Sequence, residues 1–149
     1  NGDELARALL HNLREIMWEY CGVVKSEELL TVGLNKIRDI KHRLQNIDVR
    51  INDHSCQDLI LALDLESSIV SAEATILSAL KRQESRGAHQ RNDYTEINSA
   101  ESFNISIKLN KNTNTLIISK ISTNELRQDL KDLISNSKIV YSMKNKLLE

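Results

Sequence analysis

The sequence predicts a mainly α fold: a three-helix antiparallel bundle followed by a β-hairpin and a short C-terminal helix. Apolar residues recur every three or four positions through most of residues 3–84, as amphipathic helices require. Proline is absent from all 149 residues, so nothing interrupts long helices. Apolar and polar residues alternate only after residue 102, where strands are therefore expected.

The first helix is predicted from about Asp3 to Tyr20. Asp3 is a residue type that caps helix N-termini, and Gly22 is positioned to let the chain leave through a left-handed conformation. One stripe carries the apolar residues Leu5, Leu9, Leu13, Ile16, Met17 and Tyr20.

The second helix is predicted to start at Ser26, whose hydroxyl can cap it, and to run to about Leu44. A glycine inside a helix costs up to about 1 kcal/mol relative to alanine, so Gly33 indicates a close helix crossing. The predicted buried face consists of Leu30, Gly33, Leu34, Ile37, Ile40 and Leu44.

The third helix is predicted from Ser55 to about Glu84. Ser55 and Asp58 approximate a capping box, and Gly87 is expected to end the helix. Its predicted inner stripe consists of Leu59, Ala62, Leu63, Ile69, Ala72, Ile76, Ala79 and Leu80.

The remaining sequence predicts a hairpin and a short helix. The strands cover residues 103–109 and 115–119, with a turn at 110–114. Thr123 is expected to cap a helix that runs to about Ile134, with Leu126, Leu130 and Leu133 on one side. Residues 138–149 either fray or dock on a neighbour.

A chain of 17.0 kDa suits one domain. We expect residues 1–87 to form the bundle. Residues 88–149 form an extended segment, with the hairpin and short helix, in the same domain.

Composition excludes several classes of function. The four glycines are too dispersed for a phosphate-binding loop, and a net charge of −1 does not favour nucleic-acid binding. The longest apolar stretch, Leu59–Leu63, is far too short to span a membrane. Two cysteines without a secretory signal are typical of a reduced, cytoplasmic protein.

The sequence offers no catalytic, cofactor-binding or metal-binding residues. No two histidines have the i, i+4 spacing that places two ligands on one helix face, and no Gly-x-Ser-x-Gly elbow is present. A zinc site would require Cys21 and Cys56 to meet two of the histidines His11, His42, His54 and His89.

Residues 84–94 carry the strongest local signal, because two arginines, a histidine and two carboxylates surround Gly87. Arg86 and Arg91 can each bind a carboxylate or phosphate with two parallel hydrogen bonds. Alternatively, they satisfy carbonyls at the end of the third helix and pair with Glu84 and Asp93. Both interpretations fit the residues.

This block resembles the Ser-Arg-Gly-Ala-His-x-Arg-x-Asp-Tyr signature of the succinate dehydrogenase and fumarate reductase flavoprotein family, which includes L-aspartate oxidase. The family's Met-Trp…Gly-Val-Val-Arg-x-x-Glu stretch is similar to residues 17–28, and its Ala-Leu-Glu-Leu…Ala-Glu…Ala-Leu helix is similar to residues 62–80. Thr95 stands where the family usually has proline, and Lys25 replaces the more common arginine.

The resemblance implies the C-terminal helical domain of an FAD-dependent oxidoreductase that interconverts succinate and fumarate. FAD and substrate would bind to domains absent from this sequence, so we expect the fragment alone to be inactive. Arg86, His89, Arg91 and Asp93 would form an interdomain contact with the flavin-binding domain of the same chain.

The resemblance also implies an iron–sulfur subunit as partner. The protein would be cytoplasmic, or peripheral on the cytoplasmic face of the membrane through partner subunits. Two alternatives remain: the C-terminal domain of L-aspartate oxidase, and a free-standing helical domain whose groove binds a partner helix.

Overall fold

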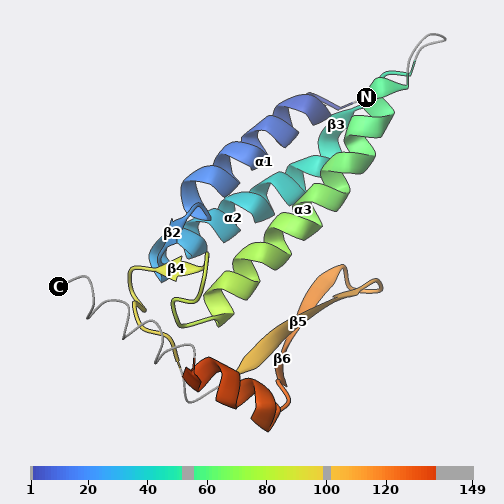
Figure 1. Cartoon of the computed structure of the whole chain (residues 1–149). Coiled ribbons are helices and arrows are strands. Elements are labelled where there is room, and N and C mark those ends of the chain that lie inside the picture. The colour runs from blue at the N-terminus through green and yellow to red at the C-terminus, as the bar shows by residue number, and fades with distance from the viewer. Residues whose placement is uncertain (1, 52–55, 99–101, 137–149) are drawn as a thin grey trace.

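Three long helices form the body of the protein. The computed structural model describes residues 2–51, 56–98 and 102–136. Helices α1 (Ala6–Tyr20), α2 (Glu27–Arg43) and α3 (Gln57–Lys81) lie side by side, and successive helices run in opposite directions (Figure 1). A single 3-10 turn, η1 (Leu44–Asn46), extends α2. The predicted mainly α fold with one antiparallel strand pair is confirmed.

Two short parallel strand pairs, which the sequence did not predict, join the ends of the helices. Strand β1 (Glu4–Leu5) pairs with β3 (Ile47–Asp48) at one end. Strand β2 (Val24–Lys25) pairs with β4 (Gln90–Arg91) at the other end. Each pair joins segments that are distant in the sequence, so the two ends of the bundle are both closed by backbone hydrogen bonds.

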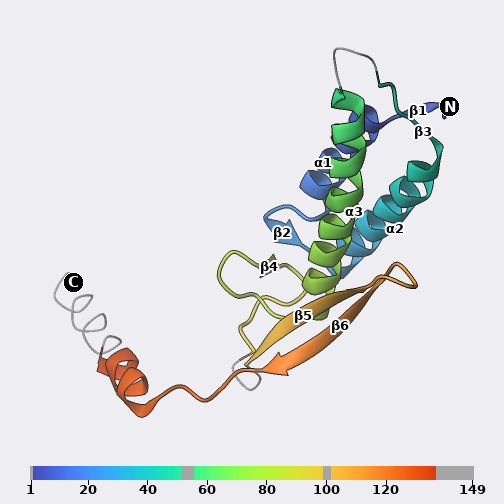
Figure 2. The same cartoon turned by 90° about the vertical axis from the view of Figure 1, so that its right-hand side faces the viewer.

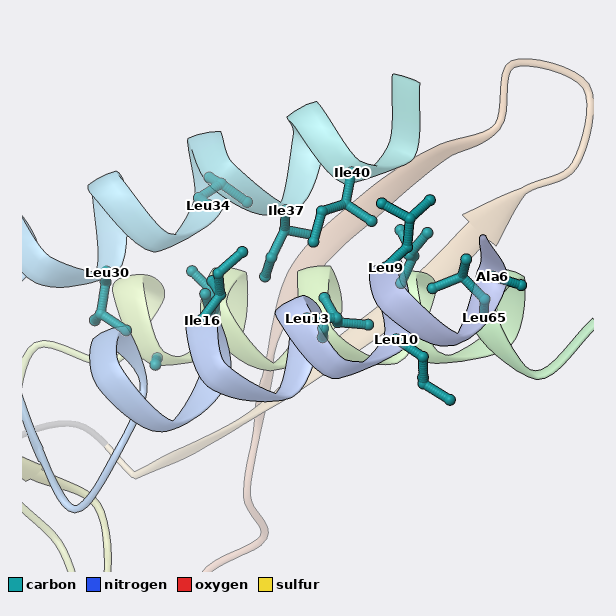
Figure 3. Close-up of a cluster of buried hydrophobic side chains, with 14 residues drawn as sticks. Ala6, Leu9, Leu10, Leu13, Ile16, Leu30, Leu34, Ile37, Ile40 and Leu65 are labelled. Atoms are coloured by element: carbon teal, nitrogen blue, oxygen red, sulfur yellow. The ribbon is translucent and has the colours of Figure 1, made fainter. Parts of the chain in front are cut away.

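The core lies between the three long helices. Figure 3 shows side chains of α1 and α2 directed toward one another, with Leu65 of α3 beside them. Every residue predicted for the buried face of α2 is buried, except that Leu44 is only partly so. The buried apolar residues are Ala6, Leu9, Leu10, Leu13, Ile16, Leu30, Leu34, Ile37, Ile40, Leu65, Ile69, Ala72, Ile76 and Ala79.

The predicted close crossing at Gly33 is confirmed. A Cβ atom there would lie 2.6 Å from Cβ of Tyr20 on α1 and 3.1 Å from Cδ1 of Ile76 on α3. Glycine therefore lets all three helices approach at one level, which offsets its low helix propensity.

One predicted cap is confirmed and two predicted helix ends are wrong. Ser26 Oγ accepts a hydrogen bond from the amide of Leu29 (3.2 Å) and caps α2. Asp3 does not cap α1, because the chain stays extended through Leu5 to form β1. Gly22 does not adopt a positive φ. Glycine fits there because a Cβ atom would lie 2.6 Å from the carbonyl oxygen of Trp18.

The predicted inner stripe of α3 was wrong in its first turns. Leu59 and Leu63 are exposed, whereas Leu65 is completely buried. At about 100° per residue, Leu63 and Leu65 lie on nearly opposite faces, and residues 59–65 are apolar at six of seven positions. The distribution of apolar residues in the first turns of α3 therefore does not show which face of the helix is buried.

The observed helix α3 begins at Gln57 and ends at Lys81. The helix ends at Lys81, before the predicted Glu84. Ser55, half of the predicted capping box, lies outside the described residues, and Cys56 occupies the N-cap position without a side-chain hydrogen bond. None of the helices in the described part of the chain combines the length and hydropathy needed to cross a bilayer.

The hairpin packs beside the end of α3 (Figure 2). Strands β5 (Phe103–Asn110) and β6 (Thr115–Ser122) pair antiparallel, in register from Phe103 with Ser122 to Asn110 with Thr115. The ammonium group of Lys41 on α2 donates to the carbonyl oxygen of Asn114 in the turn (3.1 Å), which ties the hairpin to the bundle.

The short C-terminal helix starts later than predicted. Residues 128–136 are helical, and Thr123 is not its cap. Thr123 instead continues the hairpin, because its amide and its hydroxyl both donate to the carbonyl oxygen of Ser102 (3.3 and 3.2 Å). Leu126, Leu130 and Leu133 are exposed. The predictions for residues 138–149 lie outside the described residues.

We predict that Gly33→Val destabilises the bundle by about 1–3 kcal/mol, because the new side chain overlaps Tyr20 and Ile76. Denaturant unfolding followed by circular dichroism measures the change. Asn35→Val, at an exposed position of the same helix, is the control and should cost less than about 1 kcal/mol. Equal effects of the two substitutions would contradict the close crossing.

Candidate functional site

The candidate site is the loop formed by residues 82–98, between α3 and the hairpin. Arg86 and His89 exchange two backbone hydrogen bonds of 2.8 and 3.1 Å across a tight turn. Gly87 has a φ of 59°, a left-handed conformation that glycine adopts without steric cost. Nothing lies within 4 Å of a Cβ built there, so the turn itself is what requires glycine.

Glu84 is a buried carboxylate held by several donors. It accepts hydrogen bonds from Arg82 Nη1 (2.6 Å), Arg86 Nη2 (3.0 Å) and the backbone amide of Asn98 (3.0 Å). Its residue is 1% exposed. The hydrogen bonds from Arg86 are the main reason that the pKa of Glu84 falls to about 2, although burial opposes this shift.

Arg91 is the most deeply buried charged side chain in the loop, with no exposed surface. Its Nη1 donates to the carbonyl oxygens of Ala79 (2.8 Å) and Arg82 (3.4 Å), close to the end of α3. Its Nε and Nη2 form a fork with the two carboxylate oxygens of Asp93 at 2.7 and 2.6 Å. The guanidinium carbon lies 4.9 Å from the ring centroid of Tyr94.

Asp93 connects this buried charge to a second helix. Its Oδ2 accepts a hydrogen bond from the amide of Glu27, the first residue of α2 (2.7 Å). A carboxylate at a helix N-terminus is favoured by the helix dipole. The pKa of Asp93 lies well below its usual range, chiefly because of the hydrogen bonds from Arg91. The amide of Asn92 also donates to the carbonyl oxygen of Lys25 (3.0 Å).

His89 and Ser85 complete the loop. His89 Nε2 lies 3.2 Å from the carbonyl oxygen of Arg82, and burial lowers the pKa of the imidazole. A neutral ring that donates from Nε2 fits this environment. Ser85 Oγ accepts from the amide of Arg91 (2.8 Å) and lies 2.7 Å from the carbonyl oxygen of Tyr94.

The structure brings the four predicted site residues together in one loop and gives each a partner in this chain. Of the two interpretations of Arg86 and Arg91, carbonyl satisfaction and pairing with Glu84 and Asp93 describe the observed contacts. Arg86 keeps 45% of its side chain exposed, whereas Arg91 is covered. Sequence reasoning missed Arg82 and Ser85.

The described residues do not fit a cofactor phosphate site. Gly87 is the one described glycine with a positive φ, and its turn follows a helix instead of joining a strand to a helix N-terminus. Across the described ranges, no three His, Cys, Asp or Glu side chains gather as a metal site requires.

Comparison with known proteins identifies the family. The family described as fumarate reductase flavoprotein C-term matches residues 10–141. An uncharacterised FAD-dependent oxidoreductase of Methanocaldococcus jannaschii is 36% identical over 107 residues, covering 72% of this chain and 19% of that protein. The succinate dehydrogenase flavoprotein subunit of Rickettsia felis is 35% identical over 104 residues, covering 68% and 17%.

Solved structures share the fold. A fumarate reductase from E. coli matches with a TM-score of 0.75 and 25% identity over 86% of this chain and 22% of that chain. The Sdh1 complex of Mycobacterium smegmatis matches with a TM-score of 0.77 at 22% identity, over 91% of this chain and 23% of that chain.

The family match over residues 10–141 includes most of the helical bundle and all of the loop and the hairpin. The chain belongs to the fumarate reductase flavoprotein C-terminal family. It spans about a fifth of the length of the curated relatives it matches.

We predict that the stability of the chain falls as the pH drops from about 4.5 toward 2. The pKa of Glu84 is lowered from 4.5 to about 2 by folding, so its contribution is present above pH 4.5 and is lost as the carboxylate protonates. Thermal unfolding as a function of pH measures this. The variant Glu84→Gln should be less stable at pH 7 and show a shallower fall; the same slope as wild type would contradict the role of Glu84.

We predict that Arg91→Ala costs about 3 kcal/mol, because it removes a buried ion pair and leaves helix-end carbonyls unsatisfied. Arg127→Ala is a matched control. Arg127 also forks to the carboxylate two residues later, Asp129, but both side chains are more than half exposed. The control should cost less than about 1 kcal/mol in the same denaturant titration. Similar losses would argue against a special role for the buried pair.

Proposed function

We propose that this chain is the non-catalytic helical domain of a longer FAD-dependent oxidoreductase that interconverts succinate and fumarate. The observation that carries the proposal is the family match over residues 10–141, together with relatives named as succinate dehydrogenase and fumarate reductase flavoprotein subunits. The flavin and the dicarboxylate bind to the remainder of the polypeptide. The chain by itself is inactive in this proposal.

The role of the domain is support, and the loop of residues 82–98 forms the interdomain contact. Arg91 and Asp93 hold the loop against α3 and α2, which fixes its shape. Arg86 presents the accessible part of its guanidinium group to the flavin-binding domain, with His89 beside it. The buried Glu84 keeps Arg86 in one orientation, so little side-chain entropy is lost when the contact forms.

The partners in this proposal are the flavin-binding domain of the same chain and an iron–sulfur subunit. The matched structures include a quinol–fumarate reductase with menaquinol molecules and the mycobacterial Sdh1 complex, and the second of these is named as a complex. The protein would then be cytoplasmic, or held on the cytoplasmic face of the membrane by its partner subunits.

A second candidate is the C-terminal domain of L-aspartate oxidase. The L-aspartate oxidase of Pyrococcus horikoshii is 36% identical over 83 residues, covering 56% of this chain and 13% of that protein. Purification of the complete protein from its native cell separates the two candidates. An iron–sulfur protein that co-purifies supports the dehydrogenase; aspartate oxidation without such a partner supports the oxidase.

We predict that the protein expressed from its complete coding sequence carries FAD and reduces an artificial electron acceptor with succinate. The flavin absorbance per protein should fall at least twofold in Arg86→Ala after gel filtration, because a supporting contact is lost. Arg127→Ala, an exposed arginine outside the loop, is the control and should retain its flavin.

Complete flavin retention by Arg86→Ala would contradict the interdomain role of Arg86. A complete protein without flavin, or without activity on any dicarboxylate, would contradict the proposed function itself.

A further inference from the structure

Large apolar side chains are exposed where α1 passes into β2. Trp18 is 79% exposed and is the one tryptophan of the chain, and Val23 and Val24 are 68% and 54% exposed. A tryptophan and two valines so near to one another in sequence present much more apolar surface to water than an isolated exposed residue does. Exposed apolar surface of this kind marks an interaction site on a protein.

Trp18 and Val23 line a groove of about 880 Å³ between α1 and α3. Leu10, Leu13 and Met17 contribute apolar surface from α1, so Trp18 and Val23 continue a strip that begins in the core. The groove is open to solvent.

On the α3 side of the groove, two of the hydroxyl side chains already donate hydrogen bonds within the helix. Ser71 Oγ donates to the carbonyl oxygen of Ser67 (2.9 Å), and Thr75 Oγ1 donates to that of Ser71 (2.8 Å). These hydroxyl protons are used within the helix, so the wall presents short side chains that an apolar partner can approach closely.

The rim of the groove is mainly positive. Arg14 and Lys25 line it, against the single carboxylate of Asp64. Arg14 forms no ion pair with the described residues, and the ammonium group of Lys25 donates only to the carbonyl oxygen of Val23 (3.2 Å). A partner that fits both features has an apolar segment with a carboxylate beside it.

The groove also reaches the loop of residues 82–98. Ala88, next to Gly87 in the tight turn, lines it together with Gly22 and Lys25. A body that contacts Ala88 from outside can therefore extend into the groove.

We propose that this groove is the docking surface of the flavin-binding part of the same polypeptide, which inserts an apolar segment flanked by a carboxylate. This inference rests on the proposed function. The matched relatives devote four fifths or more of their length to regions outside this domain, so the required partner is part of the same protein. A symmetric pair of copies is disfavoured, because it would place the mainly positive rim of one copy against the same rim of the other.

Cysteine labelling in the complete protein tests the docking surface. Val23→Cys introduces a thiol at the groove, and Ala8→Cys introduces one at an exposed position on another face of α1. After brief maleimide treatment, peptide mass spectrometry gives the labelling rate at each site. We expect the Val23→Cys thiol to react at least tenfold more slowly than the Ala8→Cys thiol.

Equal rates at the two sites, in samples that contain full flavin, overturn the docking surface and leave the proposed function intact. Protection that disappears on dilution of the protein indicates a second copy in the groove and also overturns it. Protection in a protein that never binds flavin contradicts both proposals, because the occupant would then not be a flavin-binding domain.

A second pair of variants makes the same test without a thiol. Trp18→Ser should lower the thermal unfolding midpoint of the complete protein by several degrees, because it removes the largest apolar side chain from the contact. Glu19→Ser, an exposed neighbour on α1, should leave the midpoint nearly unchanged. No difference between the two variants argues against the contact.

Discussion

The arrangement of this domain depends on one buried charge. The guanidinium group of Arg91 has no exposed surface, so every polar contact it needs must come from the protein. It finds them in the carbonyl oxygen of Ala79 and in the carboxylate of Asp93, which in turn accepts the amide of Glu27. Arg91 and Asp93 together therefore link the end of α3 to the start of α2.

This link explains why a polar loop without regular secondary structure keeps a fixed shape. The helices pack through apolar side chains, which specify contact but not the path of the chain after α3. Arg91 and Asp93 set that path, and the two-residue pair of β2 with β4 follows it. Ala88 of this loop then lines the groove beside Trp18, and Arg86 keeps part of its side chain exposed.

Much of this fold could be predicted from the sequence, because α1 and α2 each have an apolar period of three to four residues, which is typical of an amphipathic helix. The roles of Ser26 as a helix cap and of Gly33 at a close helix crossing could also be predicted, because each role requires a particular residue type. Leu65 was missed because its helix is apolar on more than one side. Thr123 was assigned to the wrong element because a hydroxyl serves a hairpin end as well as a helix start.

The residues of the candidate site could be predicted from the sequence, but the contacts between them could not. The resemblance singled out Arg86, His89, Arg91 and Asp93, yet both interpretations of the arginines remained open at that stage. The observed contacts of Arg86 with Glu84 and of Arg91 with Asp93 and Ala79 decide between them. Asp93 is itself placed by the amide of Glu27, 66 residues earlier in the sequence, and no local pattern reports such a contact. Pairing of Arg91 with a nearby carboxylate and with helix-end carbonyls follows from that placement.

Amide hydrogen exchange at Glu27 tests the central claim most directly. If Arg91 joins the two helix ends, Arg91→Ala should accelerate exchange at Glu27 and Asn92 at least tenfold and leave the amide of Ile37, in the core of α2, unchanged. Exchange that stays as slow as in the wild-type chain at Glu27, or that rises equally at Ile37, would contradict the account.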